Sequence, residues 1–290
     1  MPTYTRTKVR ATLSQDDYDD ICNMYEAKIP AKDIVSKYGI HRTTLPKIYK
    51  RMRGISGSLL PQIRNPEYFR NIDSHEKAYF LGFITADGCI VDNSARDATD
   101  RLMINIHEKD RVIIDRLHAV LDMDHKVYEI PSKNQVALAV THKGICDDLR
   151  QYGLDYRKSL TMPNIWPMIP EEFRDSFALG YNDGDGCILI KSYNYTTKGG
   201  VTRKYSFPGF SIAGTLDFLK GFADNFQVKD AKIRLKNSIH ELAIDKRADF
   251  WKVYDRIYAN ADKTVHLERK RNVINRLNQD QTISSPVVAS

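Results

Sequence analysis

The sequence is poor in cysteine and in long apolar runs, and each shortage excludes a class of protein. Its cysteines are Cys22, Cys89, Cys146 and Cys187, with no Cys-x-x-Cys pair and no histidine at zinc-finger distance, which excludes the usual structural zinc sites. No apolar run approaches the roughly 18 residues of a membrane-spanning helix, and there is no secretory signal. We therefore expect a soluble protein without a membrane partner, in a reducing compartment such as bacterial or phage-infected cytoplasm or an organelle.

Acidic residues are outnumbered by basic ones. The chain has 44 Lys and Arg against 37 Asp and Glu, a net charge of +7 and a pI near 9.0. This balance suits a polyanionic partner such as nucleic acid, although many proteins with the same balance bind none. The 290 residues are enough for one large domain and a small appendage.

Two segments in the middle of the chain repeat one pattern. Residues 80–88 read FLGFITADG and residues 178–186 read ALGYNDGDG, and each is followed by cysteine and isoleucine. Each has the character of an apolar helix with small residues four positions apart, which places them on one helix face. Missing side chains allow close approach, so we expect the two helices to pack through these small residues: Gly82, Ala86, Gly180 and Gly184.

Both segments end in an acidic residue followed by glycine. Asp87 and Asp185 would lie at the C-terminal ends of their helices, where the helix dipole disfavours a carboxylate. Two such carboxylates brought together need a cation. Asp-Gly can also be a simple helix stop with glycine in the left-handed conformation, but recurrence at matching positions favours a functional site. Cys89 and Cys187 follow the two motifs, and we expect them to pack in the core.

These residues resemble the LAGLIDADG motif of homing endonucleases, intein endonucleases and group I intron maturases. The first segment keeps Gly82, Ile84, Ala86, Asp87 and Gly88, and the second keeps Gly180, Asp183, Asp185 and Gly186. The resemblance covers about residues 73–277, roughly 70 per cent of the chain, and two motifs resemble the monomeric, pseudo-symmetric class. The sequence departs from the consensus at Thr85, where the family has aspartate. We expect little consequence, because the family's metal-binding acid is the later one.

Hydrophobic periodicity divides the chain into a small helical unit and two repeats. The predicted parts are a helical unit (1–53), a linker (54–72), a first repeat (73–160), a second repeat (161–277) and a disordered tail (278–290). In each repeat a motif helix is followed by strand pairs alternating with helices. The predicted fold is therefore α+β, with two αββαββα repeats, which in the family form a saddle-shaped antiparallel DNA-binding surface.

The first repeat should begin with a helix whose capping box is formed by Asp73 and Glu76. The other predicted elements of the repeats are strands at 101–107, 126–130, 135–141, 210–212, 231–236 and 239–244, and helices at 110–121, 144–152, 216–226 and 248–259.

The N-terminal unit is predicted to contain three helices. Ser14 should cap a helix that ends near Ala27, and helices at 31–38 and 43–53 should follow. Residues 31–52 resemble a resolvase-type helix-turn-helix, and Pro46 is compatible with it only in the first turn of the last helix. That helix would carry Arg42, Thr43, Thr44, Lys47 and Lys50 into a major groove. The alternative is a three-helix packing module without a DNA partner.

The sheets should carry the remaining DNA contacts. In residues 232–236 (KIRLK) cations alternate with apolar residues, so one strand face would offer a basic row to DNA. A hairpin around residues 191–200 combines cations, amides and aromatic rings. Exposed basic strands are often merely solvated, but the family resemblance extends the interface. The predicted DNA-binding residues of the repeats are Arg101, Asn105, Lys126, Lys133, Lys191, Tyr193, Asn194, Lys198, Arg203, Lys204, Lys232, Arg234 and Lys236.

Lys143 and Lys246 occupy corresponding places, each between a predicted strand and the next helix. In related enzymes a lysine at this place lies near the scissile phosphates, so the resemblance implies a catalytic role. Both residues could equally be surface lysines at helix starts.

Hydrolysis of a phosphodiester needs an activated water and neutralisation of phosphate charge. Carboxylates suit Mg2+ (or Mn2+), which retains waters and takes further ligands from phosphates. We place the metal at Asp87 and Asp185 with Gly88 and Gly186. The predicted function is that of a monomeric homing endonuclease making metal-dependent breaks in double-stranded DNA at a long, nearly palindromic target.

Other classes of function are compatible with the same scaffold. The chain could be a maturase that assists splicing of intron RNA, or a DNA-binding regulator without catalytic activity. Intact acids in both motifs favour the nuclease. A basic structural protein would leave the duplicated acidic motif unexplained.

Overall fold

The computed structural model describes residues 13–27, 29–53, 63–91, 100–124 and 126–275. The chain separates into two compact units, residues 1–62 and 63–290. Residues 54–62 of the predicted linker, and the predicted disordered tail, lie outside the described residues. No helix in the described parts of the chain is long and apolar enough to cross a bilayer.

The N-terminal unit is a small three-helix bundle. Its elements are α1 (Gln15–Glu26), α2 (Ala31–Tyr38), the 3-10 turn η1 (Arg42–Thr44) and α3 (Leu45–Arg53). Ser14 caps α1 in a capping box with Asp17, and Pro46 falls in the first turn of α3 as predicted. The buried core of this unit consists of Ile21, Cys22, Tyr25, Ile34, Leu45 and Ile48.

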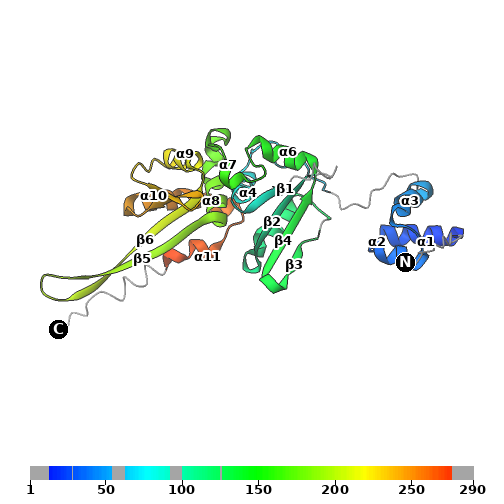
Figure 1. Ribbon diagram of the computed structural model, residues 1–290, viewed down its shortest axis with the longest axis horizontal. Coiled ribbons are helices and arrows are strands. Elements are labelled where there is room, and N and C mark those ends of the chain that lie inside the picture. Colours follow the sequence, from blue (N-terminus) through cyan, green and yellow to red (C-terminus); the bar gives the residue numbers. More distant parts are fainter. Residues whose placement is uncertain (1–12, 28, 54–62, 92–99, 125, 276–290) are drawn as a thin grey trace, which may run out of the picture. The chain divides into compact units, whose positions relative to one another are not determined.

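The second unit contains the two repeats (Figure 1). The first repeat consists of α4 (His75–Asp87), β1 (Gly88–Val91), β2 (Arg101–His107), η3 (Glu108–Asp110), α5 (Arg111–Val120), β3 (Tyr128–Ile130), η4 (Pro131–Lys133), β4 (Gln135–Thr141) and α6 (Lys143–Gln151). The second consists of α8 (Arg174–Asp185), β5 (Gly186–Thr196), β6 (Thr202–Gly214), α9 (Leu216–Phe226), β7 (Lys232–Lys236), β8 (Ile239–Ile244) and α10 (Arg247–Tyr258).

Both sheets have the same antiparallel topology. The strand orders are β1-β2-β4-β3 and β5-β6-β8-β7, which confirms the predicted fold class and duplication. Short elements that the sequence did not predict lie between and after the repeats: α7 (Lys158–Thr161), η5 (Trp166–Met168), η6 (Glu171–Phe173), η7 (Ala261–Lys263) and α11 (Glu268–Arg271).

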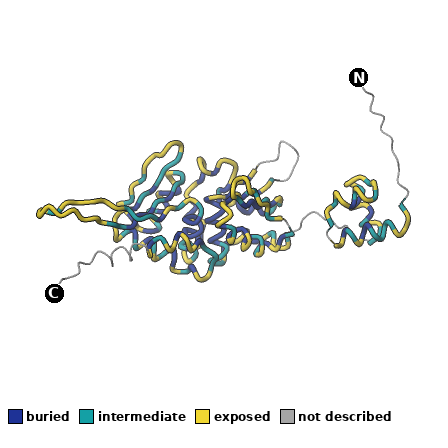
Figure 2. The backbone as a smooth tube through the Cα atoms, turned by 90° about the horizontal axis from the view of Figure 1, so that it is seen from below, coloured by how far each residue is buried: buried dark blue, intermediate teal, exposed yellow. Residues whose placement is uncertain are grey.

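One hydrophobic core is shared by both repeats. Residues 78–86 of α4 are buried on every side of the helix, as expected for an apolar helix in the middle of a large domain. Buried segments are concentrated around α4 and α8, whereas the far end of the β5–β6 hairpin is exposed (Figure 2).

The second half of the predicted linker belongs to this core. Tyr68, Phe69 and Ile72 are buried within it. Glycine and proline in residues 54–72 indicated a linker, but apolar residues of its second half pack against the repeats. The cap of α4 also differs from the prediction, because Ser74 accepts the backbone N–H of Lys77 while Asp73 forms an ion pair with the Lys77 side chain.

The end of each motif contradicts the alternative of a simple helix stop with a left-handed glycine, and the cysteine that follows departs from one expectation. Gly88 and Gly186 have extended backbones, with φ of −79° and −86°, rather than the left-handed conformation. Glycine is required there by close approach, because an added Cβ would lie 2.6 Å from the carbonyl oxygen of Ile84 or Asn182. The expectation of core packing was wrong for Cys89 and Cys187, which are exposed on the strand faces that point away from the core.

Candidate active site and nucleic-acid interface

The motif helices α4 and α8 cross through their glycines. A Cβ added at Gly82 would lie 2.9 Å from the carbonyl carbon of Phe177, and one at Gly180 would lie 2.8 Å from that of Tyr79. Gly82 and Gly180 are 98 positions apart in the sequence, and so are Tyr79 and Phe177. The crossing is therefore pseudo-symmetric. No side chain fits between the two backbones at these points.

Asp87 and Asp185 are thereby brought together at the ends of the two helices. A Cβ added at Gly184, in the last turn of α8, would lie 3.3 Å from the Asp87 carboxylate and would overlap the side chain of Ala86. Both acids remain accessible to solvent. Partial loss of hydration, followed by repulsion from Asp185, raises the pKa of Asp87 to about 6. Loss of hydration also raises the pKa of Asp185.

Two buried lysines hold the helix ends next to these acids. Lys158 Nζ, from α7, donates to the carbonyl oxygens of Thr85 and Ala86, both at 2.6 Å. Those carbonyls lie in the last turn of α4 and have no intrahelical donor, and the ammonium group also complements the negative end of the helix dipole.

Lys270 performs the same task for α8. Its Nζ, from α11, donates to the carbonyl oxygens of Asn182 at 2.5 Å, Gly184 at 3.2 Å and Gly186 at 2.8 Å. Lys158 and Lys270 are each only 8% exposed, and burial lowers the pKa of both.

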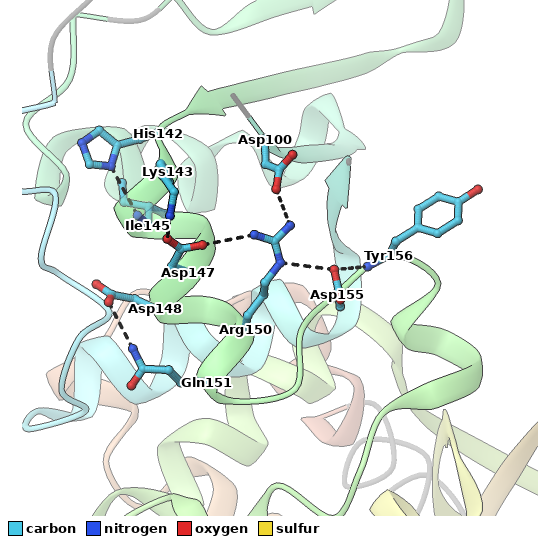
Figure 3. Close-up of polar contacts among 10 residues, drawn as sticks. All are labelled: Asp100, His142, Lys143, Ile145, Asp147, Asp148, Arg150, Gln151, Asp155 and Tyr156. Atoms are coloured by element: carbon cyan, nitrogen blue, oxygen red, sulfur yellow. Dashed lines mark hydrogen bonds and ion pairs between the residues drawn. The ribbon is translucent and has the colours of Figure 1, made fainter. Parts of the chain in front are cut away.

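Sequence reasoning missed Lys158 and Lys270. They follow their motif acids by 71 and 85 residues, and this unequal spacing conceals their equivalence. The predicted pair lies elsewhere: Lys143 starts α6, is 83% exposed and pairs with Asp147 at 2.6 Å (Figure 3). Lys246 is 60% exposed and pairs with Asp230 at 2.8 Å. A catalytic role for Lys143 and Lys246 stays a prediction.

The donor atoms around the two acids fit a hard divalent cation. Within the described residues, no group of three or more His, Cys, Asp and Glu side chains could hold a metal ion. A cation between Asp87 and Asp185 would therefore take its other ligands from water or phosphate, as Mg2+ commonly does. The carbonyl oxygen of Gly186 accepts a hydrogen bond from Lys270. A pocket of about 200 Å³ is lined partly by Asp185, Lys158 and Tyr181.

The strand register sorts the predicted DNA-binding residues by sheet face. Arg101 and Asn105 lie on the outer face of the first sheet, with Cys89. In the second sheet the outer face, which also bears Cys187, carries Lys191, Tyr193, Arg203, Lys232, Arg234 and Lys236. Asn194 and Lys204 are paired with each other on the opposite face, so the residues predicted on this hairpin do not form one surface.

Lys126 and Lys133 lie outside the strands. Both are exposed, and Lys133 belongs to the η4 turn. Lys198 is exposed in the turn that joins β5 to β6.

The outer part of the β5–β6 hairpin, residues 189–209, forms a two-stranded arm. Strand β8 pairs only with the last five residues of β6, from Phe210 to Gly214. The arm contains Lys191, Lys198, Arg203 and Lys204 and no acidic residue. A two-stranded ribbon is of a size that the major groove admits.

Aromatic rings line the outer face of the arm. They belong to Tyr193, Tyr195, Tyr205 and Phe207, and the centroids of Tyr193 and Tyr205 are 5.4 Å apart. Tyr193 is 53% exposed. The arm therefore presents an aromatic, cationic face toward the same side as Cys187 and β7.

The N-terminal unit exposes the predicted recognition residues. Arg42, Thr43, Lys47 and Lys50 are exposed and Thr44 is half-buried, while Leu45 and Ile48 anchor α3 in the core. Among the ion pairs of the described residues, none involves Arg42, Lys47 or Lys50. The helix-turn-helix function of this unit stays a prediction.

Comparison with solved structures supports the architecture. No family model and no curated protein matches the sequence. Among solved structures, the I-LtrWI LAGLIDADG homing endonuclease bound to target DNA matches with a TM-score of 0.51 and 13% identity, covering 76% of this chain and 92% of that one. The LAGLIDADG meganuclease I-AabMI bound to uncleaved DNA matches with a TM-score of 0.50 and 16% identity, covering 71% and 90%. The two repeats of this chain have the LAGLIDADG homing-endonuclease fold.

Proposed function

We propose that this protein is a site-specific endonuclease that makes Mg2+- or Mn2+-dependent double-strand breaks in DNA. The observation that carries the proposal is the meeting of Asp87 and Asp185 at the ends of two crossed helices, beside two sheets of identical topology. The pseudo-twofold relation gives one acid to each DNA strand, and differences between the repeats predict a target that is only nearly palindromic. The solved relatives are described as bound to DNA, which supports a DNA partner.

The chain's own residues would prepare both the metal and the phosphate. Asp87 and Asp185 would bind the cation, which when bound lowers the pKa of water and polarises phosphate oxygens. Lys158 uses two of its three N–H donors on described acceptors, so one remains for a phosphate or a water. Lys270 uses all three on carbonyls. We therefore place Lys158, in addition to the predicted Lys143 and Lys246, among the cations that serve catalysis.

The product of the reaction tests this function. With Mg2+ the protein is expected to convert a supercoiled plasmid carrying its target into the linear form. Tight binding without any cut in Mg2+ or Mn2+ would contradict the nuclease and favour a regulator. Stimulation of intron RNA splicing without DNA cleavage would favour a maturase.

The proposed DNA surface extends over the outer sheet faces, the arm and the N-terminal unit. In the last of these, Arg42, Thr43, Thr44, Lys47 and Lys50 would contact DNA as a second reading element. The arm would enter the major groove with its aromatic face toward the DNA, because that face continues the outer face of the second sheet.

Arg203 and Lys204 are adjacent in the sequence and lie on opposite faces of the arm, so the two faces can be tested separately. Arg203→Ala removes a charge from the outer face and is expected to weaken target binding about 10-fold and to reduce the salt dependence by about one phosphate contact. Lys204→Ala removes the same charge from the opposite face and is expected to change affinity less than 3-fold. Fluorescence anisotropy at two salt concentrations measures both variants. Equal effects would show that the arm does not present its outer face to DNA.

The partial burial of Asp87, together with its repulsion by Asp185, predicts a pH dependence of the metal-free protein. The pKa of Asp87 is raised to about 6 in the folded state and is near 3.8 when unfolded. As the pH rises, the unfolded state therefore loses the Asp87 proton before the folded state does. The free energy of unfolding then falls between about pH 4 and pH 6. Asp87→Asn removes this loss, so its stability relative to the parent is expected to increase over that range. Urea unfolding in EDTA at several pH values measures the difference, and a pH-independent difference would contradict the assignment.

A further inference from the structure

The last turn of α8 is held by a segment that follows the second repeat. This segment, residues 267–270, is called the C-terminal clasp here. Three of its groups bond to other parts of the unit: the backbone N–H of Leu267, the guanidinium of Arg269 and the ammonium of Lys270. Together they connect the end of α8 with both repeats.

Asp183 anchors the first of these groups. It lies in α8 with only 2% of its surface exposed. Its Oδ2 accepts the backbone N–H of Leu267 at 2.8 Å and the hydroxyl of Tyr79 at 2.9 Å. Tyr79 belongs to α4, so this one oxygen joins both motif helices to the clasp.

Arg269 forms the second anchor. Its guanidinium binds Asp110 through two bonds, Nε to Oδ1 at 2.7 Å and Nη2 to Oδ2 at 2.6 Å. Asp110 precedes α5 in the first repeat and is 7% exposed. A bidentate pair of this kind fixes orientation as well as distance.

The clasp ends at the carbonyls that flank Asp185. Lys270 donates to Gly184 on one side of Asp185 and to Gly186 on the other. The backbone of Asp185 is therefore fixed from both sides by a lysine that the clasp positions.

In the described part of the first repeat there is no corresponding anchor at the position that matches Asp183. Thr85 occupies that position, and its hydroxyl donates to the carbonyl of Leu81 in its own helix at 2.7 Å. The departure from the family consensus at Thr85 therefore has a structural consequence that we did not expect. A lysine holds the end of each motif helix, but among the described residues only Lys270 belongs to a segment that is anchored by an acid of its own motif.

The Asp183 carboxylate has one oxygen that serves as an anchor and one that does not. Its Oδ1 is buried and has no hydrogen-bond partner among the described residues, and an unpaired buried acceptor costs free energy. An apolar side chain would avoid this cost, but it would leave the Leu267 N–H and the Tyr79 hydroxyl without the acceptor that Oδ2 provides.

Resting on the proposed nuclease function, we propose that Asp183 is a positioning residue, which holds Lys270 through Leu267 and thereby fixes Asp185 for cleavage of one DNA strand. Cutting of the two strands then depends on different parts of the chain. Loss of the Asp183 anchor impairs one strand selectively and converts the enzyme toward a nickase.

Three variants at matched positions test the proposal. Asp183→Thr introduces the residue that the first repeat has at the matching position. In α4 that residue, Thr85, satisfies its hydroxyl by a hydrogen bond within its own helix. Asp183→Asn can keep an acceptor oxygen in the place of Oδ2. Thr85→Val removes the hydroxyl at the equivalent position of the other helix. Each is measured on an end-labelled target duplex with Mg2+, with the cleavage rate of each strand recorded separately.

Asp183→Thr is expected to change the ratio of the two strand rates at least 10-fold, whereas Asp183→Asn and Thr85→Val change it less than 3-fold. An unchanged ratio, or an equal fall on both strands, would overturn the proposal. Hydrogen exchange gives a readout without catalysis: the Leu267 amide should exchange at least 10-fold faster in Asp183→Thr than in Asp183→Asn, and equal protection would also overturn it. If the parent protein cuts neither strand, the proposed function fails instead.

Discussion

Gly180→Ala is expected to destabilise the protein by at least about 3 kcal/mol, at or beyond the upper end of ordinary overpacking. The added methyl would overlap the carbonyl oxygen of Tyr79 and lie 2.9 Å from the backbone nitrogen of Phe83. Both contacts are backbone, so they can be relieved only by separating α4 from α8. For a unit of this size we expect the melting temperature to fall by roughly 6–12 °C or more.

Gly199→Ala is the control for the intrinsic effect of replacing glycine. An added Cβ at Gly199, in the turn of the arm, would meet nothing within 4 Å, so its stability should remain within about 0.5 kcal/mol of the parent. Thermal unfolding of the two variants and of Gly82→Ala measures the contrast. A melting temperature of Gly180→Ala equal to that of Gly199→Ala would show that the motif helices do not cross through their glycines.

Asp87→Asn and Asp185→Asn are each expected to lower double-strand cleavage at least 100-fold while leaving target affinity within about 3-fold of the parent. The carboxylates bind the cation whose charge stabilises the reacting phosphate, whereas affinity comes from contacts along the strands and the arm. Cleavage in Mg2+ and anisotropy in EDTA separate the two properties. Loss of affinity in both variants would assign structural roles to these acids.

The central geometry was predictable from the sequence because it is encoded locally and twice. Small residues at fixed spacing, followed by an acid and a glycine, specify a helix crossing and its charged end at the same time. The alternation of aliphatic residues with other residues along 101–107 likewise predicted β2, and the structure buries one face of that strand and exposes most of the other.

Elements that do not have one buried and one exposed face were missed or were predicted too short. Strand β6 was predicted only at residues 210–212 but extends from Thr202 to Gly214, because both faces of the arm are exposed and leave little periodic signal. The two lysines that bind the helix-end carbonyls were missed for another reason. Lys158 and Lys270 belong to helices of only four residues, and their partners are backbone carbonyls distant in sequence, which have no side-chain signature.

The measurement that tests the central claim most directly is cleavage of a DNA library that carries the uninterrupted sequence around the gene's insertion point. The parent and the Asp87→Asn, Asp185→Asn double variant are compared in Mg2+ and in EDTA. We expect the parent to cut one site in Mg2+ alone and the double variant to cut none. Cutting by the double variant, or cutting by the parent in EDTA, would contradict a metal-dependent site built on these two acids.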